Sequence, residues 1–310
     1  MKIGILGSGG IGGYFGGRLA AAGSDVTFVA RGRHLAAMRK DGLRIRSGLG
    51  DLHIEKPRTV ETIDEAGDLD LVFVGVKLWD TEEVAKSLEA MVRRGAAAVS
   101  FQNGVQKDEI LRRHLPDGAI IGGLSYIAAK IGEPGVIEHS GALQKLVFGE
   151  YGGAVTGRVS ALKKACEDAR IDVEVSADIE RLIWEKFVFL VGLSGTTSLF
   201  GTPIGPIRED IEKRALLLNV MEEVVTVGRT KGIGLDEGFA KDRLAFCDSI
   251  PAGMTSSMQV DLERGNRLEL PWLSGAVVDI GLDLGISTPA NKRIVETLTP
   301  SVMGRADAAK

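Results

Sequence analysis

The sequence predicts an α/β domain followed by an all-helical domain, and three observations favour this arrangement. In the first half, short apolar runs rich in β-branched residues alternate with stretches whose apolar residues have helical spacing. After about residue 176, strand signals almost disappear and helical patterns follow one another. A chain of 310 residues is also too long for one ordinary core. We therefore predict one domain over 1–176 and a second over 177–310.

The strand-like runs of the first half are nearly continuous in apolar residues, which is typical of strands buried on both faces. They predict a doubly wound, mostly parallel sheet. The five runs are KIGILG (2–7), DVTFVAR (25–31), LDLVFVGVK (69–77), AAAVSFQN (96–103) and AIIGGLS (119–125). Helices are expected at 80–94 and 105–114, and hairpin-like insertions around 43–54 and 135–150.

The second half contains four helical stretches with recognisable ends. The stretches are SADIERLIWEKFVFLVGLSGTTSLF, REDIEKRALLLNVMEEVVTVGRTKG, DEGFAKDRLAFCDSI and LSGAVVDIGLDLG. Ser176 or Asp178 is expected to open the first, and Gly232 to end the second after a basic last turn. The most apolar window contains Glu185 and Lys186, so we expect no membrane span there. The last stretch, SVMGRADAAK, is expected to be a loose tail.

Composition excludes several functional classes. Apolar residues make up 44% of the chain and charged residues 26%, with a net charge of −4, so we expect a soluble globular protein without a nucleic-acid surface. Cys166 and Cys247 lie far apart in the sequence, which fits a reducing compartment. No leader with a charged and then an apolar segment is evident, so we expect a cytoplasmic protein. The four histidines have no metal-ligand spacing, and we predict no metal. The sequence leaves a homodimer open.

A glycine-rich loop follows the first expected strand. Gly7, Gly9 and Gly12 form G-x-G-x-x-G, in which the first glycine permits a tight turn, the second lets the backbone approach a pyrophosphate, and the third lets helix and strand pack closely. The N-terminus of the following helix would present N–H groups to the phosphates. This placement predicts a Rossmann-like dinucleotide site, and the alternative is a glycine-rich turn without a ligand.

The end of the second strand distinguishes between cofactors. NAD-binding proteins usually place Asp or Glu there, whereas this chain has Arg31, followed by Arg33 and His34. A guanidinium can bind a 2′-phosphate with two charge-assisted hydrogen bonds, and Lys77 could add a second cation. We therefore predict NADP(H). The alternative is that Arg31 and Lys77 are solvated loop charges.

Four further residues are candidates for chemistry, and each has an ordinary structural alternative. The amide of Asn103 could bridge cofactor and substrate, or it could belong to a plain Asn-Gly turn. Lys186, in an apolar helix, could donate a proton to a carbonyl, or its side chain could extend to solvent. Glu269 could hold Lys186 charged, or be an exposed carboxylate at a helix end. Ser257 could bind a carboxylate, or act as an N-cap.

These residues together make the chain resemble the 2-dehydropantoate 2-reductase (ketopantoate reductase) family, whose members reduce 2-dehydropantoate with NADPH. The likeness runs from Met1 to about Asn291 and rests on GSGGIG, Arg31, GVKLWD, QNGV, IWEKF, SSMQVDLERG with a glutamate twelve residues after Ser257, and GISTPAN. The resemblance implies a proton donor at Lys186, with Glu269 and Asn103 as its partners in catalysis. It also implies substrate contacts at Asn103, Lys186, Ser194 and Ser257. The cofactor contacts that it implies are Gly7, Ser8, Gly9, Gly10, Ile11, Gly12, Arg31, Lys77, Asn103, Ala129 and Glu269.

The chain departs from the family where well-studied members carry asparagines that hold the substrate. Leu190, Ser194 and Ile204 stand at those places. Losing amides removes hydrogen bonds to a hydroxylated substrate, and such bonds can carry large discrimination. The substrate is therefore expected to be 2-dehydropantoate or a more apolar 2-oxo acid. A non-catalytic nucleotide-binding module is the third interpretation, and a proton donor argues against it.

Overall fold

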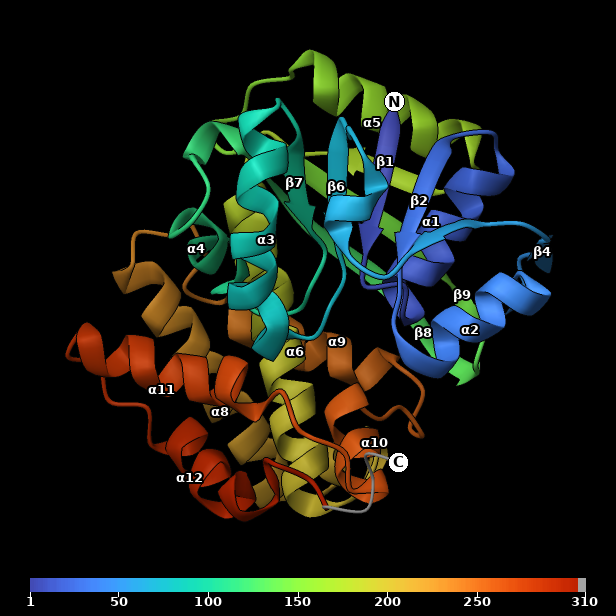
Figure 1. Cartoon of the computed structure of the whole chain (residues 1–310). Coiled ribbons are helices and arrows are strands. Elements are labelled where there is room, and N and C mark those ends of the chain that lie inside the picture. Colours follow the sequence, from blue (N-terminus) through green and yellow to red (C-terminus); the bar gives the residue numbers. More distant parts are fainter. Residues whose placement is uncertain (306–310) are drawn as a thin grey trace. The chain divides into compact units, whose positions relative to one another are not determined.

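The structure, a computed structural model, describes residues 1–305 and divides into two compact units. The first unit comprises Met1–Asn103 and Lys107–Ile179 (Figure 1). The second comprises residues 104–106 and the chain from Glu180 onward. The break in contacts therefore follows Ile179, a few residues beyond the boundary predicted after residue 176, and three residues of an early loop join the second unit.

The first unit is built on one mixed sheet. From one edge to the other, the strand order is β4-β3-β9-β8-β7-β6-β1-β2-β5, and β10 pairs with β9. The strands are β1 (Lys2–Leu6), β2 (Asp25–Val29), β3 (Leu43–Ser47), β4 (Leu52–Ile54), β5 (Arg58–Val60), β6 (Leu71–Val74), β7 (Ala97–Ser100), β8 (Ile120–Glu133), β9 (Val136–Glu150) and β10 (Asp172–Val175).

Six neighbouring strands of this sheet, β5-β2-β1-β6-β7-β8, are all parallel. This is the strand order of a doubly wound dinucleotide-binding sheet, and the predicted fold class is confirmed. On one side of β1 lie β2 and β5, although the chain forms β3 and β4 at the opposite edge between them; on the other side lie β6, β7 and β8 in chain order. The topological switch point therefore lies between β1 and β6, and the glycine loop follows β1.

Both predicted hairpins occur, but the second is longer than the sequence indicates. β3 and β4 pair antiparallel, and β8 pairs antiparallel with β9 along strands of 14 and 15 residues. Gly135 lies in the turn between β8 and β9 with φ +80°. The hairpin also joins β3 to the sheet, because β3 runs parallel to β9. The sheet is thus parallel on one side and mixed on the other.

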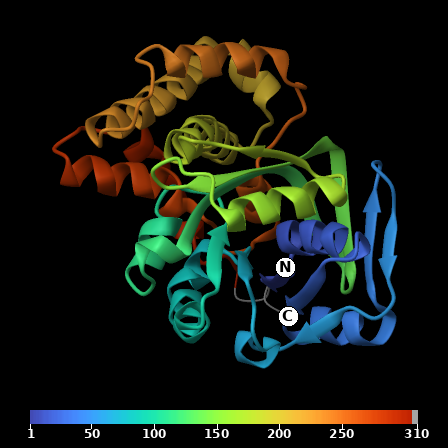
Figure 2. The same cartoon turned by 90° about the horizontal axis from the view of Figure 1, so that it is seen from above.

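Helices cover both faces of the sheet (Figure 2). Alternate residues of β6 enter different cores, with Phe73 in one cluster and Val72 in the other, as expected of a strand buried on both faces. Side chains of α1, α2 and α5 join the Phe73 cluster, and those of α3 and α4 join the Val72 cluster. These helices are α1 (Gly10–Ala21), α2 (Gly32–Asp41), α3 (Thr81–Arg93), α4 (Lys107–Arg112) and α5 (Gly157–Asp168).

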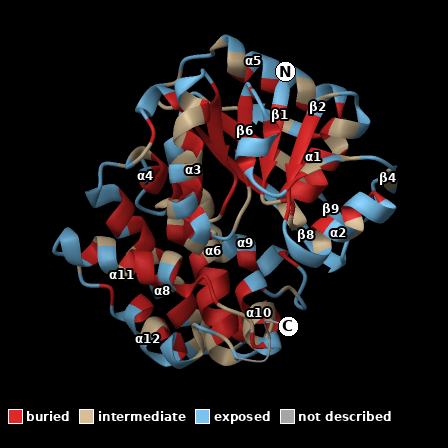
Figure 3. Ribbon diagram, in the orientation of Figure 1, coloured by how far each residue is buried: buried red, intermediate tan, exposed pale blue. Residues whose placement is uncertain are grey.

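The described part of the second unit contains helices and no strand, as predicted. The long helix α6 has the length and composition of a membrane span, yet 67% of its apolar window is buried inside the protein, so it serves as a core helix (Figure 3). The helices are α6 (Ile179–Phe200), α7 (Ile204–Glu209), α8 (Ile211–Thr230), α9 (Phe239–Ser249), α10 (Ser257–Arg264), α11 (Ser274–Asp283) and α12 (Pro289–Leu298).

Two predictions about helix and chain ends have different outcomes. Gly232 follows α8 with φ +95° and donates its N–H to the carbonyl of Arg229, so the predicted helix end is confirmed. The expectation of a loose tail is wrong for residues 301–305. Leu268 donates its N–H to the carbonyl of Val302, and Arg305 donates to the carbonyl of Gly265. The other tail residues, 306–310, lie outside the described part.

Candidate functional site

The glycine loop has the geometry that a dinucleotide fingerprint requires. Gly7 has φ +100°, a conformation that side chains disfavour. A Cβ on Gly12 would lie 2.2 Å from the carbonyl oxygen of Gly7, so only glycine lets α1 approach β1 this closely. A Cβ on Gly9 would meet nothing within 4 Å, which leaves open space beside the N-terminus of α1. That space, with no side-chain cap on the helix, fits a pyrophosphate.

The rest of the loop is held against the sheet. The Ser8 side chain is 3% exposed and donates to the carbonyl of Val29, which ties the loop to the end of β2. A Cβ on Gly10 would lie 2.2 Å from the carbonyl oxygen of Ala129 on β8, so that strand lies directly behind the loop. Ile11 packs partly buried against the core. Ser8 therefore faces the protein with its side chain, and any cofactor contact there would be made by the backbone.

The predicted cofactor cations follow parallel strands, whose carboxyl ends meet at one edge of the sheet. Arg31 follows β2, and its side chain is 73% exposed, with its guanidinium 4.0 Å from the carboxylate of Glu83 on α3. Lys77 follows β6, and its ammonium lies 5.7 Å from the centre of the Trp79 ring. Arg31 and the α3 region are thus close in space although 52 residues separate Arg31 from Glu83 in the sequence.

A histidine beside the loop was not singled out as a functional residue by the sequence. His34 Nδ1 accepts a hydrogen bond of 3.0 Å from the backbone N–H of Gly135, in the β8–β9 turn. The backbone of Ser8 faces the same ring, and burial lowers the pKa of His34 below its ordinary value. His34 therefore connects α2, the glycine loop and the long hairpin as a neutral imidazole.

Asn103 is half-buried in the loop that follows β7, and hydrogen bonds of its neighbour Gln102 hold this loop. Gln102 donates from Nε2 to the carbonyl of Val76 and to the hydroxyl of Thr81, and it accepts from Ser100 Oγ. It thereby joins the loop bearing Asn103 to the turn bearing Lys77. The sequence pattern QNG drew attention to Asn103 and did not indicate this role of Gln102.

A second buried group beneath the same loop was also missed. Lys107 is 1% exposed, and its ammonium donates to the carbonyl of Ser100 at 2.8 Å and to Asp108 Oδ2 at 2.9 Å. Tyr151 also donates to Asp108 Oδ2, at 2.7 Å. Burial lowers the pKa of Lys107, and the neighbouring carboxylate opposes that shift. The sequence around Lys107 is a polar turn, QNGVQ, after which a lysine ordinarily has a solvated side chain.

In the second unit, Lys186 is half-buried on α6. Leu190 and Ser194 lie four and eight residues further along and therefore share its side of the helix. Leu190 is half-buried, whereas Ser194 is fully buried and its hydroxyl finds no partner among the described residues. Ile204 is 0% exposed within the hydrophobic core, so this replacement for a family asparagine is a packing residue.

The structural alternatives for Ser257 and Glu269 are wrong. Ser256, not Ser257, is the N-cap of α10, and its Oγ accepts from the N–H of Gln259. Ser257 is exposed at the first position of the helix. Glu269 is 8% exposed rather than solvated, and it precedes the short turn Leu270–Trp272. Ser257 is therefore not the cap of α10, and Glu269 is not a surface carboxylate.

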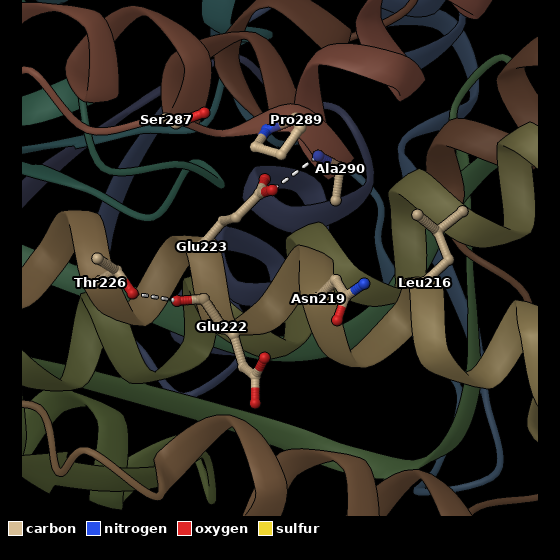
Figure 4. Close-up of a pocket in the computed structure, with 8 residues that line it drawn as sticks. All are labelled: Leu216, Asn219, Glu222, Glu223, Thr226, Ser287, Pro289 and Ala290. Carbon is tan, nitrogen blue, oxygen red and sulfur yellow. Dashed lines mark hydrogen bonds between the residues drawn. The ribbon is translucent and has the colours of Figure 1, made fainter.

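A separate hollow of about 450 Å³ lies between α8 and the start of α12 (Figure 4). Glu223 lines this hollow, and its carboxylate accepts hydrogen bonds from the N–H groups of Ala290 and Asn291, which caps the N-terminus of α12. Asn291 is fully buried and also donates to the carbonyl of Val220. The terminal motif GISTPAN is thus explained by helix capping, and no predicted site residue lines the hollow. Within residues 1–305 no group of three or more potential metal ligands occurs.

Comparison with known proteins identifies relatives that match nearly the whole chain. The family model described as "Ketopantoate reductase PanE/ApbA" matches residues 3–153, and its C-terminal counterpart matches residues 178–301. A 2-dehydropantoate 2-reductase of Archaeoglobus fulgidus is 32% identical over 296 residues, covering 95% of this chain and 96% of that protein. An uncharacterized oxidoreductase of Bacillus subtilis, YkpB, is 30% identical over 298 residues, covering 96% and 98%.

Solved structures agree with the fold over nearly the whole chain. A 2-dehydropantoate 2-reductase from Geobacter metallireducens has a TM-score of 0.89 at 29% identity, covering 97% of this chain and 100% of that one. D-mandelate dehydrogenase with NADH has a TM-score of 0.85 at 21% identity, covering 97% and 98%. The second likeness is one of fold alone.

Proposed function

The chain belongs to the ketopantoate reductase family and is an oxidoreductase of that type, and we propose that it reduces 2-dehydropantoate to pantoate with NADPH. The observation that carries this proposal is the pairing of an open dinucleotide loop in one unit with a half-buried lysine on an apolar helix in the other. A module that only bound nucleotides would not need that lysine.

NADPH is proposed over NADH because of Arg31. Its exposed guanidinium follows β2, where a carboxylate would hydrogen-bond the ribose of NAD and repel a 2′-phosphate. Lys77 would add a second cation, and the open space at Gly9 would receive the pyrophosphate. Asn103, Ala129, Glu269 and the loop backbone would complete the cofactor contacts. Bound in this way, the cofactor supplies a hydride to the 2-oxo carbon of the substrate.

The protein's own groups would bind the substrate and move a proton. The Lys186 ammonium would polarise the 2-oxo group and give its oxygen a proton as the hydride arrives. Glu269 would keep Lys186 charged, and Asn103 would align the reacting groups. Ser257, with the first N–H groups of α10, would bind the substrate carboxylate, because a helix N-terminus favours an anion.

A second substrate class is favoured by a specific observation. Leu190 shares the Lys186 side of α6 and offers an apolar surface instead of an amide, while Ile204 lies in the core. Of the three substituted positions, only Ser194 retains a hydroxyl for the substrate. A more apolar 2-oxo acid would therefore lose little on binding and could be the better substrate.

The experiment that tests the proposal measures NADPH oxidation by absorbance. The substrates are 2-dehydropantoate, which has a 4-hydroxyl group, and a panel of 2-oxo acids that lack this group. A kcat/KM for 2-dehydropantoate well above the others supports the first substrate, and a preference for an apolar acid supports the second. Turnover of none of them contradicts both.

Two variants test the assigned roles. Lys186→Ala should lower kcat by about 100-fold or more with NADPH binding retained, as expected for a lost proton donor. Arg31→Ala should weaken the binding of NADPH about tenfold and change the binding of NADH little, because only NADPH has the 2′-phosphate. Arg93→Ala is the matched control, since that side chain is similarly exposed, at 72%, and pairs with Glu89 on its own helix. Equal weakening of both cofactors by Arg31→Ala would refute the 2′-phosphate assignment.

A further inference from the structure

Two adjacent threonines on α6 are alike in every respect but one. Thr196 and Thr197 are both 0% exposed. Each donates its hydroxyl proton to the carbonyl four residues earlier, Thr196 to Gly192 at 2.7 Å and Thr197 to Leu193 at 2.6 Å. Of the two, only the Thr197 hydroxyl makes a second hydrogen bond to a described residue, with Ser256 Oγ at 2.9 Å. Thr197 therefore links α6 to the cap of α10, across 59 residues of sequence.

The direction of that link follows from counting protons. A hydroxyl carries one proton and two acceptor positions, and the proton of Thr197 is used on the Leu193 carbonyl. Ser256 must therefore donate to Thr197. Ser256 Oγ in turn accepts from the N–H of Gln259, at 3.1 Å. An unbroken series of hydrogen bonds thus runs from the backbone of α6 to the first turn of α10.

This series joins two parts of the proposed site. Lys186 lies eleven residues before Thr197 on α6, about three helical turns, so both are on the same side of one helix. Ser257 follows the capped serine directly. We propose that Thr197 is a positioning residue, which fixes the N-terminus of α10 relative to Lys186 so that one substrate can meet both its carboxylate site and its proton donor. This inference rests on the carboxylate role proposed for Ser257.

The kinetic test compares three variants. Thr197→Val keeps the side-chain shape but leaves the buried Ser256 hydroxyl without an acceptor. We expect KM for the 2-oxo acid to rise about fivefold, the equivalent of one buried hydrogen bond, with kcat and KM for NADPH little changed. Thr197→Ser, which restores the hydroxyl, should recover KM. Thr196→Val is the matched control and should leave KM unchanged. Equal effects of Thr197→Val and Thr196→Val would overturn the proposal.

Hydrogen exchange separates this inference from the function on which it rests. In Thr197→Val, the backbone amides of residues 257–260 should exchange faster than in Thr196→Val, without any substrate present. Equal exchange in the two variants overturns the positioning role. Ser257→Ala should itself raise KM for the 2-oxo acid. If it does not, the carboxylate role of Ser257 is wrong, and faster exchange in Thr197→Val alone would still support the placement of α10 by Thr197.

Discussion

Replacing Lys107 by methionine should be among the most damaging single changes in the first unit. Its ammonium is 1% exposed and compensates the carboxylate of Asp108, which is 3% exposed. Without it, Asp108 would keep the hydrogen bond from Tyr151, while Asp108 Oδ1 has no partner among the described residues even in the intact protein. Removing one member of a buried ion pair costs about 3–5 kcal/mol, because the remaining charge stays desolvated. In a unit of this size that lowers Tm by about 10 °C.

The assay is urea unfolding followed by circular dichroism, with the free energy of unfolding compared among four proteins. Lys163→Met is the control, because Lys163 pairs with Glu167 on an exposed helix face, and it should change stability by less than about 0.5 kcal/mol. Lys107→Met should lose about 3–5 kcal/mol, and the double variant Lys107→Met with Asp108→Asn should recover part of that loss by removing the uncompensated charge. A loss below about 1 kcal/mol in Lys107→Met, or a double variant less stable than the single one, would refute the reasoning.

Three further predictions follow from local geometry. Gly9→Ala should keep the wild-type Tm and weaken NADPH binding, because its Cβ enters only the space left for the cofactor. Gly12→Ala should lower Tm, because its Cβ would lie 2.2 Å from the carbonyl oxygen of Gly7. Equal Tm values for the two variants would contradict this. Burial lowers the pKa of His34 from 6.5, so its contribution to the free energy of unfolding is complete above pH 6.5 and is lost as the pH falls below that value. In urea titrations at several pH values, His34→Asn should therefore reduce the dependence of the free energy of unfolding on pH below 6.5. Burial raises the pKa of Cys166 to about 12 and of Cys247 to about 11, so neither should react with a disulfide reagent at pH 8 until urea is added, and rapid native labelling would disagree.

The fold could be predicted where local pattern and topology coincide. The five apolar runs became β1, β2, β6, β7 and β8, because each is short, bounded by turn residues and buried on both faces of the sheet. The short strands β5 and β10 were missed. Residues 172–175 read DVEV, with every residue partly exposed, and only pairing with β9 makes them a strand. The length of β8 was underestimated for the same reason, since its outer half is exposed and is held by its partner strand.

The candidate site could be predicted as far as single residues reveal their chemistry. The spacing of Gly7, Gly9 and Gly12 follows directly from the steric requirements of the loop, so the loop could be predicted from the sequence alone. The buried groups that hold the loops of the site have no comparable sequence motif. Lys107 and His34 have ordinary sequence surroundings, and their importance comes from burial beside segments distant in the sequence. Such contacts depend on the register of several strands and cannot be obtained from local composition.

The distinction between Ser256 and Ser257 shows why the location of a motif does not settle the role of its residues. Both serines precede the same helix and both could cap it. The structure commits Ser256 to the cap and to Thr197, so its one proton is used inside the protein and its side chain is buried, while Ser257 remains exposed one position later. A shift of one residue would exchange these roles, and in the structure it is Ser256 that contacts Thr197, 59 residues earlier on α6. Under the proposed positioning role of Thr197, the helix that carries the proposed proton donor would also determine which serine is available to the substrate.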